Sequence, residues 1–492
     1  MTLLGPVIAR SAATKQSLLV MKSGIERTKS NTKKCENWVN SQMSAYITVI
    51  GGGLAGSEAA WQLARRGLPV RIVEMKPSRY SPAHQSFNLG ELVCSNSLRA
   101  SSVTSAAGLL KEELRIMNSL ILEAADATAV PAGKALAVDR DLFASFITSR
   151  LEEEPLVTVE RTEATRIPDA SDGLVIVASG PLTSDSLAQD IARIIGSDGL
   201  SFYDAIAPIV AADSLDMSKI FRASRYGEGE GDYLNCPMDE TLYRAFVDAI
   251  VHAKKVDPYP FENIPHFEGC LPVEEIAGRG PDTLSFGPMK PVGLVDPATG
   301  KRPFAVVQLR AENRERTLFN LVGFQTKMTH PEQERVFRMI PGLENASFVR
   351  LGSIHRNTYL DAPRALDEFS RCRNRPHAFF AGQITGVEGY IESTASGLVV
   401  GILAGLLARG LEPRLPSSGT AIGALMKHTR DLPSKRYEPM NVNFGIIDSA
   451  AEGTPKKRKK EMVAQRALDA VRAWKAELES MWGQSEVRCS EL

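Results

Sequence analysis

The sequence has few cysteines, and none of them form the pairs that bind metals. Its 492 residues contain six, with no C-x-x-C spacing: Cys35, Cys94, Cys236, Cys270, Cys372 and Cys489. This scatter argues against zinc and iron–sulfur sites and is typical of a reduced cytosolic compartment. We therefore expect no metal, a cytoplasmic location, and any important cysteine to act as a single thiol.

The chain also lacks a long apolar run and a net charge. Its longest apolar stretch, residues 397–408, is shorter than the roughly 20 residues that cross a bilayer, so we expect no membrane span. Lys plus Arg and Asp plus Glu each number 58, which taken alone argues against a nucleic-acid partner. The charge is uneven, however. Residues 1–42 and 455–478 each carry +5, and residues 43–454 carry −8.

A glycine turn follows the first predicted strand, which ends at Ile50. Gly51 permits a tight turn, Gly53 lets the backbone approach a pyrophosphate, and Gly56 lets the next helix pack closely. A predicted helix over 57–66 and a strand over 70–74 complete the unit. The helix N-terminus would face the pyrophosphate, and Glu74 would accept a hydrogen bond from a ribose hydroxyl. This unit predicts a dinucleotide site; a glycine turn without a ligand is the alternative.

A second segment narrows the choice of dinucleotide. Residues 378–386 predict a strand that ends at Ala381, Gly382 and Gln383, ahead of a small-residue helix over 393–407. This arrangement suits a flavin whose ring lies across the sheet, although alone it fits an ordinary strand–helix turn equally well. The expected FAD-binding residues are Gly51, Gly52, Gly53, Leu54, Ala55, Gly56, Glu74, Gly382 and Gln383.

We predict an α/β protein with a Rossmann-like FAD-binding domain and an inserted α+β domain. The expected ranges are a disordered extension at 1–44, FAD-binding segments at 45–125, 171–200 and 336–450, an insertion at 126–170 and 201–335, and a basic tail and helix at 451–492. Within them, a helix is expected over 107–125, a buried strand that ends at a tight turn over 174–181, strands over 304–309 and 318–324, and an amphipathic helix over 461–478.

Several longer motifs carry a resemblance to a known family. They include Leu92–Arg99, Leu234–Met238, Phe286–Leu294 and Gly386–Tyr390, and they follow one another in the expected order. From about residue 45 to about residue 480 the chain closely resembles the bacterial folate- and FAD-dependent tRNA uracil-5 methyltransferases, which are related to glucose-inhibited division protein A. Residues 1–42 have no counterpart in that pattern.

The resemblance implies methylation of carbon 5 of uridine 54 in the tRNA T-loop. Methylenetetrahydrofolate would donate the carbon, and FAD reduced by NAD(P)H would carry and reduce it. Cys94 and Cys236 match the positions of the family's two functional cysteines. One thiolate would add to uracil carbon 6 and the other would assist proton handling at carbon 5, since addition at carbon 6 makes carbon 5 nucleophilic.

The reactivity of the two cysteines depends on their surroundings in the folded protein. A reactive thiol needs cationic neighbours or a helix N-terminus, and His84 and Arg99 are the cations close to Cys94 in sequence. The alternative is that both cysteines are buried in the core and pack as small hydrophobic side chains.

The basic run Lys456, Lys457, Arg458, Lys459 and Lys460 precedes the last predicted helix. It is similar to a nuclear localisation signal, but next to a helix in this family it favours contact with tRNA phosphates; a solubilising linker is the alternative. Three rival functions stay open. They are wobble-uridine modification, a flavin pyridine-nucleotide oxidoreductase, and a non-catalytic flavin-bearing RNA-binding protein.

Overall fold

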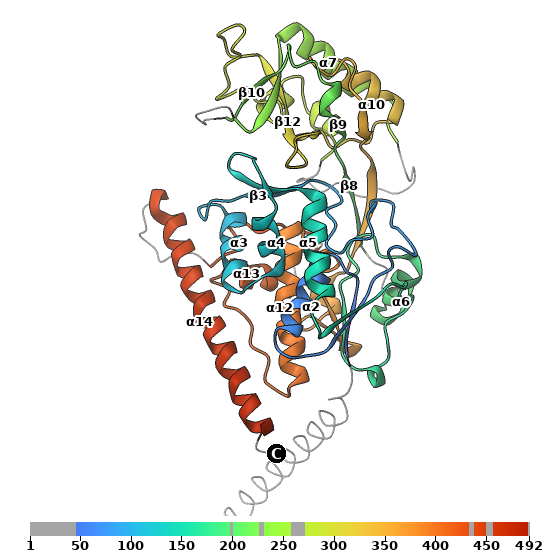
Figure 1. Cartoon of the computed structure of the whole chain (residues 1–492), viewed down its shortest axis with the longest axis vertical. Helices are drawn as coiled ribbons and strands as arrows, with labels where there is room; N and C mark the ends of the chain where they lie inside the picture. Colours follow the sequence, from blue (N-terminus) through green and yellow to red (C-terminus); the bar gives the residue numbers. More distant parts are fainter. Residues whose placement is uncertain are drawn as a thin grey trace, which may run out of the picture.

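The computed structural model describes residues 46–196, 200–225, 231–256, 271–431, 437–448 and 456–490 (Figure 1). The expected extension at 1–44 lies outside these residues. The described chain forms two bodies, which we name the large-sheet domain and the inserted domain.

A six-stranded sheet organises the large-sheet domain. Its strand order is β16 (Arg371–Cys372), β17 (Arg375–Phe380), β7 (Val175–Val177), β1 (Ile47–Ile50), β2 (Val70–Val73) and β6 (Val157–Glu160). The neighbours from β17 to β6 pair in parallel, and β16 pairs antiparallel at the edge. β1 and β7 are buried along their whole length, as expected for parallel strands covered on both faces. The predicted α/β class is confirmed.

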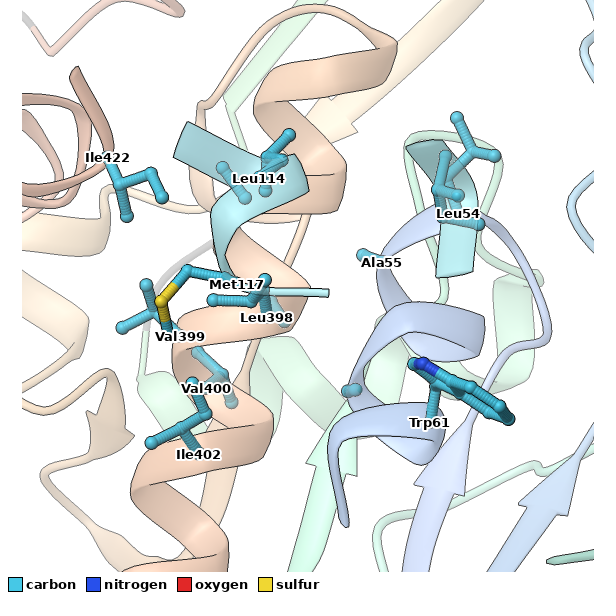
Figure 2. Packing of buried hydrophobic residues seen from close by; sticks show 14 of the residues in the cluster. Leu54, Ala55, Trp61, Leu114, Met117, Leu398, Val399, Val400, Ile402 and Ile422 are labelled. Atoms are coloured by element: carbon cyan, nitrogen blue, oxygen red, sulfur yellow. The ribbon is translucent and has the colours of Figure 1, made fainter. Parts of the chain in front are cut away.

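Two closely packed helices cover one face of this sheet. α2 (Leu54–Ala64) begins directly at the glycine turn, three residues earlier than expected, and lies beside α12 (Tyr390–Ala408). Figure 2 shows Ala55 of α2 pointing toward α12. Close approach requires glycine, because a Cβ at Gly397 would lie 2.1 Å from the Ala55 carbonyl oxygen.

The expectation that no segment is long and apolar enough to cross a bilayer was wrong. α12 has 19 residues and is long and apolar enough to cross a membrane, because the helix begins at Tyr390, before the uninterrupted apolar run. Its most apolar window is 83% buried inside the protein. The helix therefore serves as a core element of the large-sheet domain.

Further helices complete this domain. The single helix expected over 107–125 is two, α3 (Ala106–Ile116) and α4 (Leu120–Ala127), because Asn118 adopts φ 58° and Ser119 caps α4 by accepting from the Leu122 N–H. The remaining elements are α5 (Arg140–Glu152), α6 (Asp185–Ile195), α13 (Ala421–His428) and a small sheet of β3 (Ser97–Ala100), β5 (Ala135–Val138) and β4 (Ala129–Val130). α14 (Lys456–Ser490) runs along the domain against α3.

The inserted domain is built on an antiparallel sheet. Its order is β10 (Phe221–Ala223), β11 (Tyr233–Met238), β12 (Ala305–Ala311), β13 (Leu318–Leu321), β9 (Ile209–Ala211) and β14 (Phe348–Arg350). One face packs on α7 (Glu240–His252) and α10 (His330–Phe337) to form a core. α8 (Val273–Gly278) and α9 (Thr283–Phe286) lie beside α7. The ribbon of β8 (Leu200–Ala205) and β15 (Ile354–Tyr359) connects the two domains.

The sheets divide the chain differently from the expected ranges. β6 falls within 126–170, assigned to the insertion, yet it pairs with β2 in the large sheet. β14 falls after residue 335, yet it pairs with β9 of the inserted sheet. Both strands are short, and their sheet is set by pairing with residues distant in sequence, which composition does not reveal.

Candidate active site

A cavity opens where the strands of the large sheet end, at the place where doubly wound sheets bind dinucleotides. It is lined by both predicted fingerprints, including Gly51, Gly53, Leu54, Ala55, Glu74, Gly382 and Gln383. Residues more than 300 positions apart therefore share one site, as the sequence predicted for a dinucleotide.

The glycine turn leaves space on the cavity side alone. Gly51 has φ 100°, and a Cβ there would lie 2.6 Å from the Ala178 carbonyl oxygen; a Cβ at Gly56 would lie 1.9 Å from the Gly51 carbonyl oxygen. At Gly53 a Cβ would meet no atom within 4 Å. Because Gly53 borders the cavity at the start of α2, this open space and the helix N-terminus fit a pyrophosphate.

Glu74 directly follows β2 and holds this turn. Its Oε2 accepts from the Gly52 N–H at 2.7 Å, and its Oε1 accepts from the Lys76 N–H at 3.0 Å. Each carboxylate oxygen can accept a second bond, so Glu74 can also receive a ribose hydroxyl in the cavity. The residues present therefore fit FAD.

A second cavity adjoins the first and contains Cys94. Both cavities are bordered by Val93, Pro181, Leu182, Gln383 and Tyr390, and the second is also lined by Cys94, Arg99, Gln325, Asn357, Glu388 and Asn441. The Cys94 N–H donates to Tyr390 Oη at 2.8 Å, and its Sγ lies 3.8 Å from the Ala205 carbonyl oxygen. The Cys94 thiol thus lies beside the end of the first cavity, which we name the dinucleotide cavity; the second is named the Cys94 cavity.

The two cations expected near Cys94 do different things. Arg99 lines the Cys94 cavity and pairs with Glu392 at 2.7 Å. His84 lines the dinucleotide cavity, its ring bonded to Ser81 Oγ at 2.6 Å, and burial together with the charge of Lys76 lowers its pKa to about 4. His84 is therefore neutral at pH 7 and cannot be the expected cation.

Sequence reasoning missed two other cations beside Cys94. Arg140 Nη2 donates to the Cys94 carbonyl oxygen at 3.3 Å, and Arg310 Nη2 donates to Ser95 Oγ at 2.8 Å. They lie 46 and 215 positions away from their partners. No local motif marks either arginine. The pairing of β3 with β5 brings Arg140, which shortly follows β5, to this segment, and packing of the inserted domain brings Arg310.

Cys236 lies elsewhere. It is fully buried in β11 within the core of the inserted domain, and burial raises the pKa of its thiol far above the usual range. It lines neither cavity, so the described conformation does not bring Cys94 and Cys236 together. Cys372 is also buried. Cys35 and Cys270 lie outside the described residues.

The basic run forms the first turns of α14. Arg458 and Lys459 are exposed, and Lys460 Nζ lies 5.7 Å from the centroid of the Phe444 ring; the side chains of Lys456 and Lys457 are outside the description. Figure 1 shows this end of α14 toward the inserted domain. Asn441 of the Cys94 cavity is three residues from Phe444, a span of at most about 11 Å.

Comparisons with known proteins agree with this geometry. The family model described as glucose inhibited division protein A matches residues 46–412. The chain is 60% identical over 437 residues, 89% of this chain and 100% of the relative, to the methylenetetrahydrofolate–tRNA-(uracil-5-)-methyltransferase TrmFO of Citrifermentans bemidjiense. It is 59% identical to the enzyme of that name from Geobacter sulfurreducens, over 88% of this chain and 100% of the relative.

A solved structure supports the fold. The GidA protein of Aquifex aeolicus superposes with a TM-score of 0.65 at 16% identity, covering 91% of this chain and 76% of that protein.

Proposed function

Because this chain belongs to the glucose inhibited division protein A family, and is about 60% identical to several of its tRNA methyltransferases, we propose that it transfers a methyl group to carbon 5 of uracil in tRNA. Methylenetetrahydrofolate is the carbon donor and FAD the cofactor. The observation that carries this proposal is the position of Cys94, in a cavity that adjoins the dinucleotide cavity.

The finer assignments follow from the family resemblance. The target is uridine 54 of the T-loop, and a reduced nicotinamide nucleotide supplies the electrons in the cytoplasm. FAD, when bound, supplies one-carbon carriage and reduction. The residues that would hold it are those of the glycine turn, together with Glu74, Gly382 and Gln383. All of them border the dinucleotide cavity except Gly52 and Gly56, which shape the turn beneath it.

Cys94 is the proposed nucleophile. Its thiolate adds to uracil carbon 6, the electron pair moves toward carbon 5, and carbon 5 then attacks the one-carbon unit. Loss of the carbon 5 proton and departure of the thiolate restore the double bond between carbons 5 and 6. To become a methyl group the transferred carbon must also gain two electrons and leave its carrier nitrogen, and FAD reduced by the nicotinamide nucleotide would supply those electrons. The wall that the two cavities share would bring the uracil next to the carbon carrier.

The second thiol is less well placed. Cys236, our sequence-based choice, can reach a substrate only if the inserted domain rearranges, because its side chain has no exposure. Cys270 is a second candidate. Val273, three residues later, donates its N–H to the carbonyl oxygen of Gln325, and Gln325 lines the Cys94 cavity.

A donor-swap assay on purified holoenzyme tests the function. We expect methylation of unmodified tRNA only with methylenetetrahydrofolate and a reduced nicotinamide, and none with S-adenosylmethionine alone. Cys94→Ala should abolish it, and Cys372→Ala is the matched buried-cysteine control. Full activity in Cys94→Ala would refute the assignment of the nucleophile. Parallel Cys236→Ala and Cys270→Ala variants identify the second thiol, and full activity in Cys236→Ala removes that residue from the mechanism.

The basic start of α14 is proposed to bind tRNA phosphates. Its cations are exposed, and Lys460 lies against Phe444, only three residues from Asn441 of the Cys94 cavity. Replacing Arg458 and Lys459 by Gln should weaken tRNA binding and lower the slope of affinity against salt concentration by about 1 to 2. Arg472→Gln, further along the same helix and paired with Asp469, is the control. Unchanged affinity and slope would leave the run as a solubilising segment.

A further inference from the structure

Two arginines, one from each domain, donate hydrogen bonds to the segment that carries Cys94. Arg140, at the start of α5, donates to the carbonyl oxygens of Leu92 and Cys94, the latter at 3.3 Å. Arg310, on β12, donates to Ser95 Oγ and Asn96 Oδ1, each at 2.8 Å. Four of the five residues from 92 to 96 therefore accept a bond from a guanidinium group.

These hydrogen bonds, together with an ion pair, cross the boundary between the two domains. Glu312, directly after β12, accepts from Arg140 Nε at 3.0 Å and Nη2 at 2.8 Å. Asn96 Nδ2 in turn donates to the Ala311 carbonyl oxygen at 2.9 Å. The side chain of Glu312 is 3% exposed, and a buried ion pair is costly to break because it leaves an unpaired charge. The Cys94 segment is thus fixed to the inserted sheet as well as to its own domain.

The same arrangement places positive charge beside the thiol. Cys94 is among the groups that interact electrostatically with both guanidinium groups, and Arg310 is buried. A planar guanidinium also fixes the orientation of the groups that accept from it, which an ammonium group does not.

We propose that Arg140 and Arg310 are positioning residues for Cys94, which hold its segment in place only while the inserted domain is docked on the large-sheet domain. This inference rests on the proposed role of Cys94. Neither arginine is required to touch the substrate.

Alkylation of the holoenzyme tests the inference without using methylation. The rate of Cys94 modification by iodoacetamide is measured from pH 6 to pH 9, with the adduct located by mass spectrometry. In Arg310→Gln we expect a rate at pH 7 about tenfold lower, because Ser95 and Asn96 lose the guanidinium group that orients the segment. In Arg310→Lys, which keeps the charge, the rate should stay within about threefold of the wild type.

Methylation kinetics separate positioning from charge. Both Arg310 variants should lower kcat and leave the KM for tRNA within about twofold, because the fork geometry that orients the segment is lost in each. Arg314→Gln is the matched control. Arg314 lies on the same inserted domain, away from Cys94. Its guanidinium group donates to the Ala127 carbonyl oxygen across the same boundary, while its backbone N–H, which the substitution keeps, donates to Asp139.

Two results would overturn the inference. One is an unchanged alkylation rate in Arg310→Gln with retained FAD; the other is an equal effect in Arg314→Gln, which would indicate general loss of docking. If Arg310→Gln does not retain FAD, Arg310→Lys decides, and a wild-type kcat in that variant refutes the positioning role. Full methylation by Cys94→Ala would instead refute the proposed function, whatever the alkylation rates show.

Discussion

Glu74 shows how one carboxylate can support a cofactor site from behind. It accepts from the Gly52 and Lys76 N–H groups, so it fixes the glycine turn as well as facing the cavity. Glu74→Ala should lower FAD affinity by at least about tenfold, because two backbone donors and a ribose hydroxyl lose a charged acceptor. Titration of the apoprotein with FAD, followed by flavin fluorescence, measures the change.

Glu160 offers a control at the same scale. It ends β6, the strand next to β2, and its half-exposed side chain lies 3.9 Å from Arg71. It does not border the dinucleotide cavity. Glu160→Ala should therefore leave FAD affinity unchanged, and similar losses in both variants would contradict the specific role of Glu74.

At the scale of elements, the contact between α2 and α12 controls the shape of the site. Ala55 both borders the cavity and lies against Gly397. Gly397→Ala places a Cβ 2.1 Å from backbone, so the helices must move apart, at a cost of about 1–3 kcal/mol. We expect a lower Tm and partial loss of FAD, measured by thermal unfolding and by the ratio of flavin to protein absorbance.

Gly405 provides the comparison on the same helix. A Cβ there would meet the ends of the Trp482, Leu68 and Leu63 side chains at 3.1–3.3 Å, which can adjust. The better helix propensity of Ala offsets that contact by up to about 1 kcal/mol. Gly405→Ala should thus keep its FAD, and an equal FAD loss in both variants would show that the position of Ala55 is not the cause.

Local patterns predicted the elements whose signals are local. The glycine turn, β2 and the segment ending at Gly382 were all found, because each needs special backbone geometry or an apolar run. The break between α3 and α4 was missed because Asn118 and Ser119 sit in an otherwise helical pattern. The surroundings of Cys94 and the core position of Cys236 follow from pairing between distant strands, to which sequence spacing gives no access.

At the scale of the whole molecule, two domains with separate cores meet at the segment that carries Cys94. The cores are distinct clusters, one around α2 and α12 and one between the inserted sheet and α7. The β8–β15 ribbon connects them, and Asn96, Arg140, Arg310 and Glu312 bridge them. Domain docking and the geometry of the Cys94 segment are therefore linked through these bonds.

Stability of the whole molecule should also carry a signature of a carboxyl buried in the core. Burial raises the pKa of Glu113 from 4.5 to about 8, although its oxygens accept from the Ala421 and Ile422 N–H groups at 2.7 and 2.8 Å. The folded state then holds a proton that the unfolded chain has released. This contribution to stability is complete below pH 4.5, declines by about 1.4 kcal/mol per pH unit as pH rises, and is lost near pH 8.

Comparison of the wild type with Glu113→Gln isolates this slope. The amide cannot titrate, and although its NH₂ group faces a backbone donor, that mismatch lowers stability by the same amount at every pH. The free energy of urea unfolding, measured on FAD-saturated protein between pH 5 and pH 8, should therefore fall more steeply for the wild type than for the variant. Parallel curves would mean that the two backbone donors keep Glu113 ionised, and that α13 is capped by a charge instead of a neutral carboxyl.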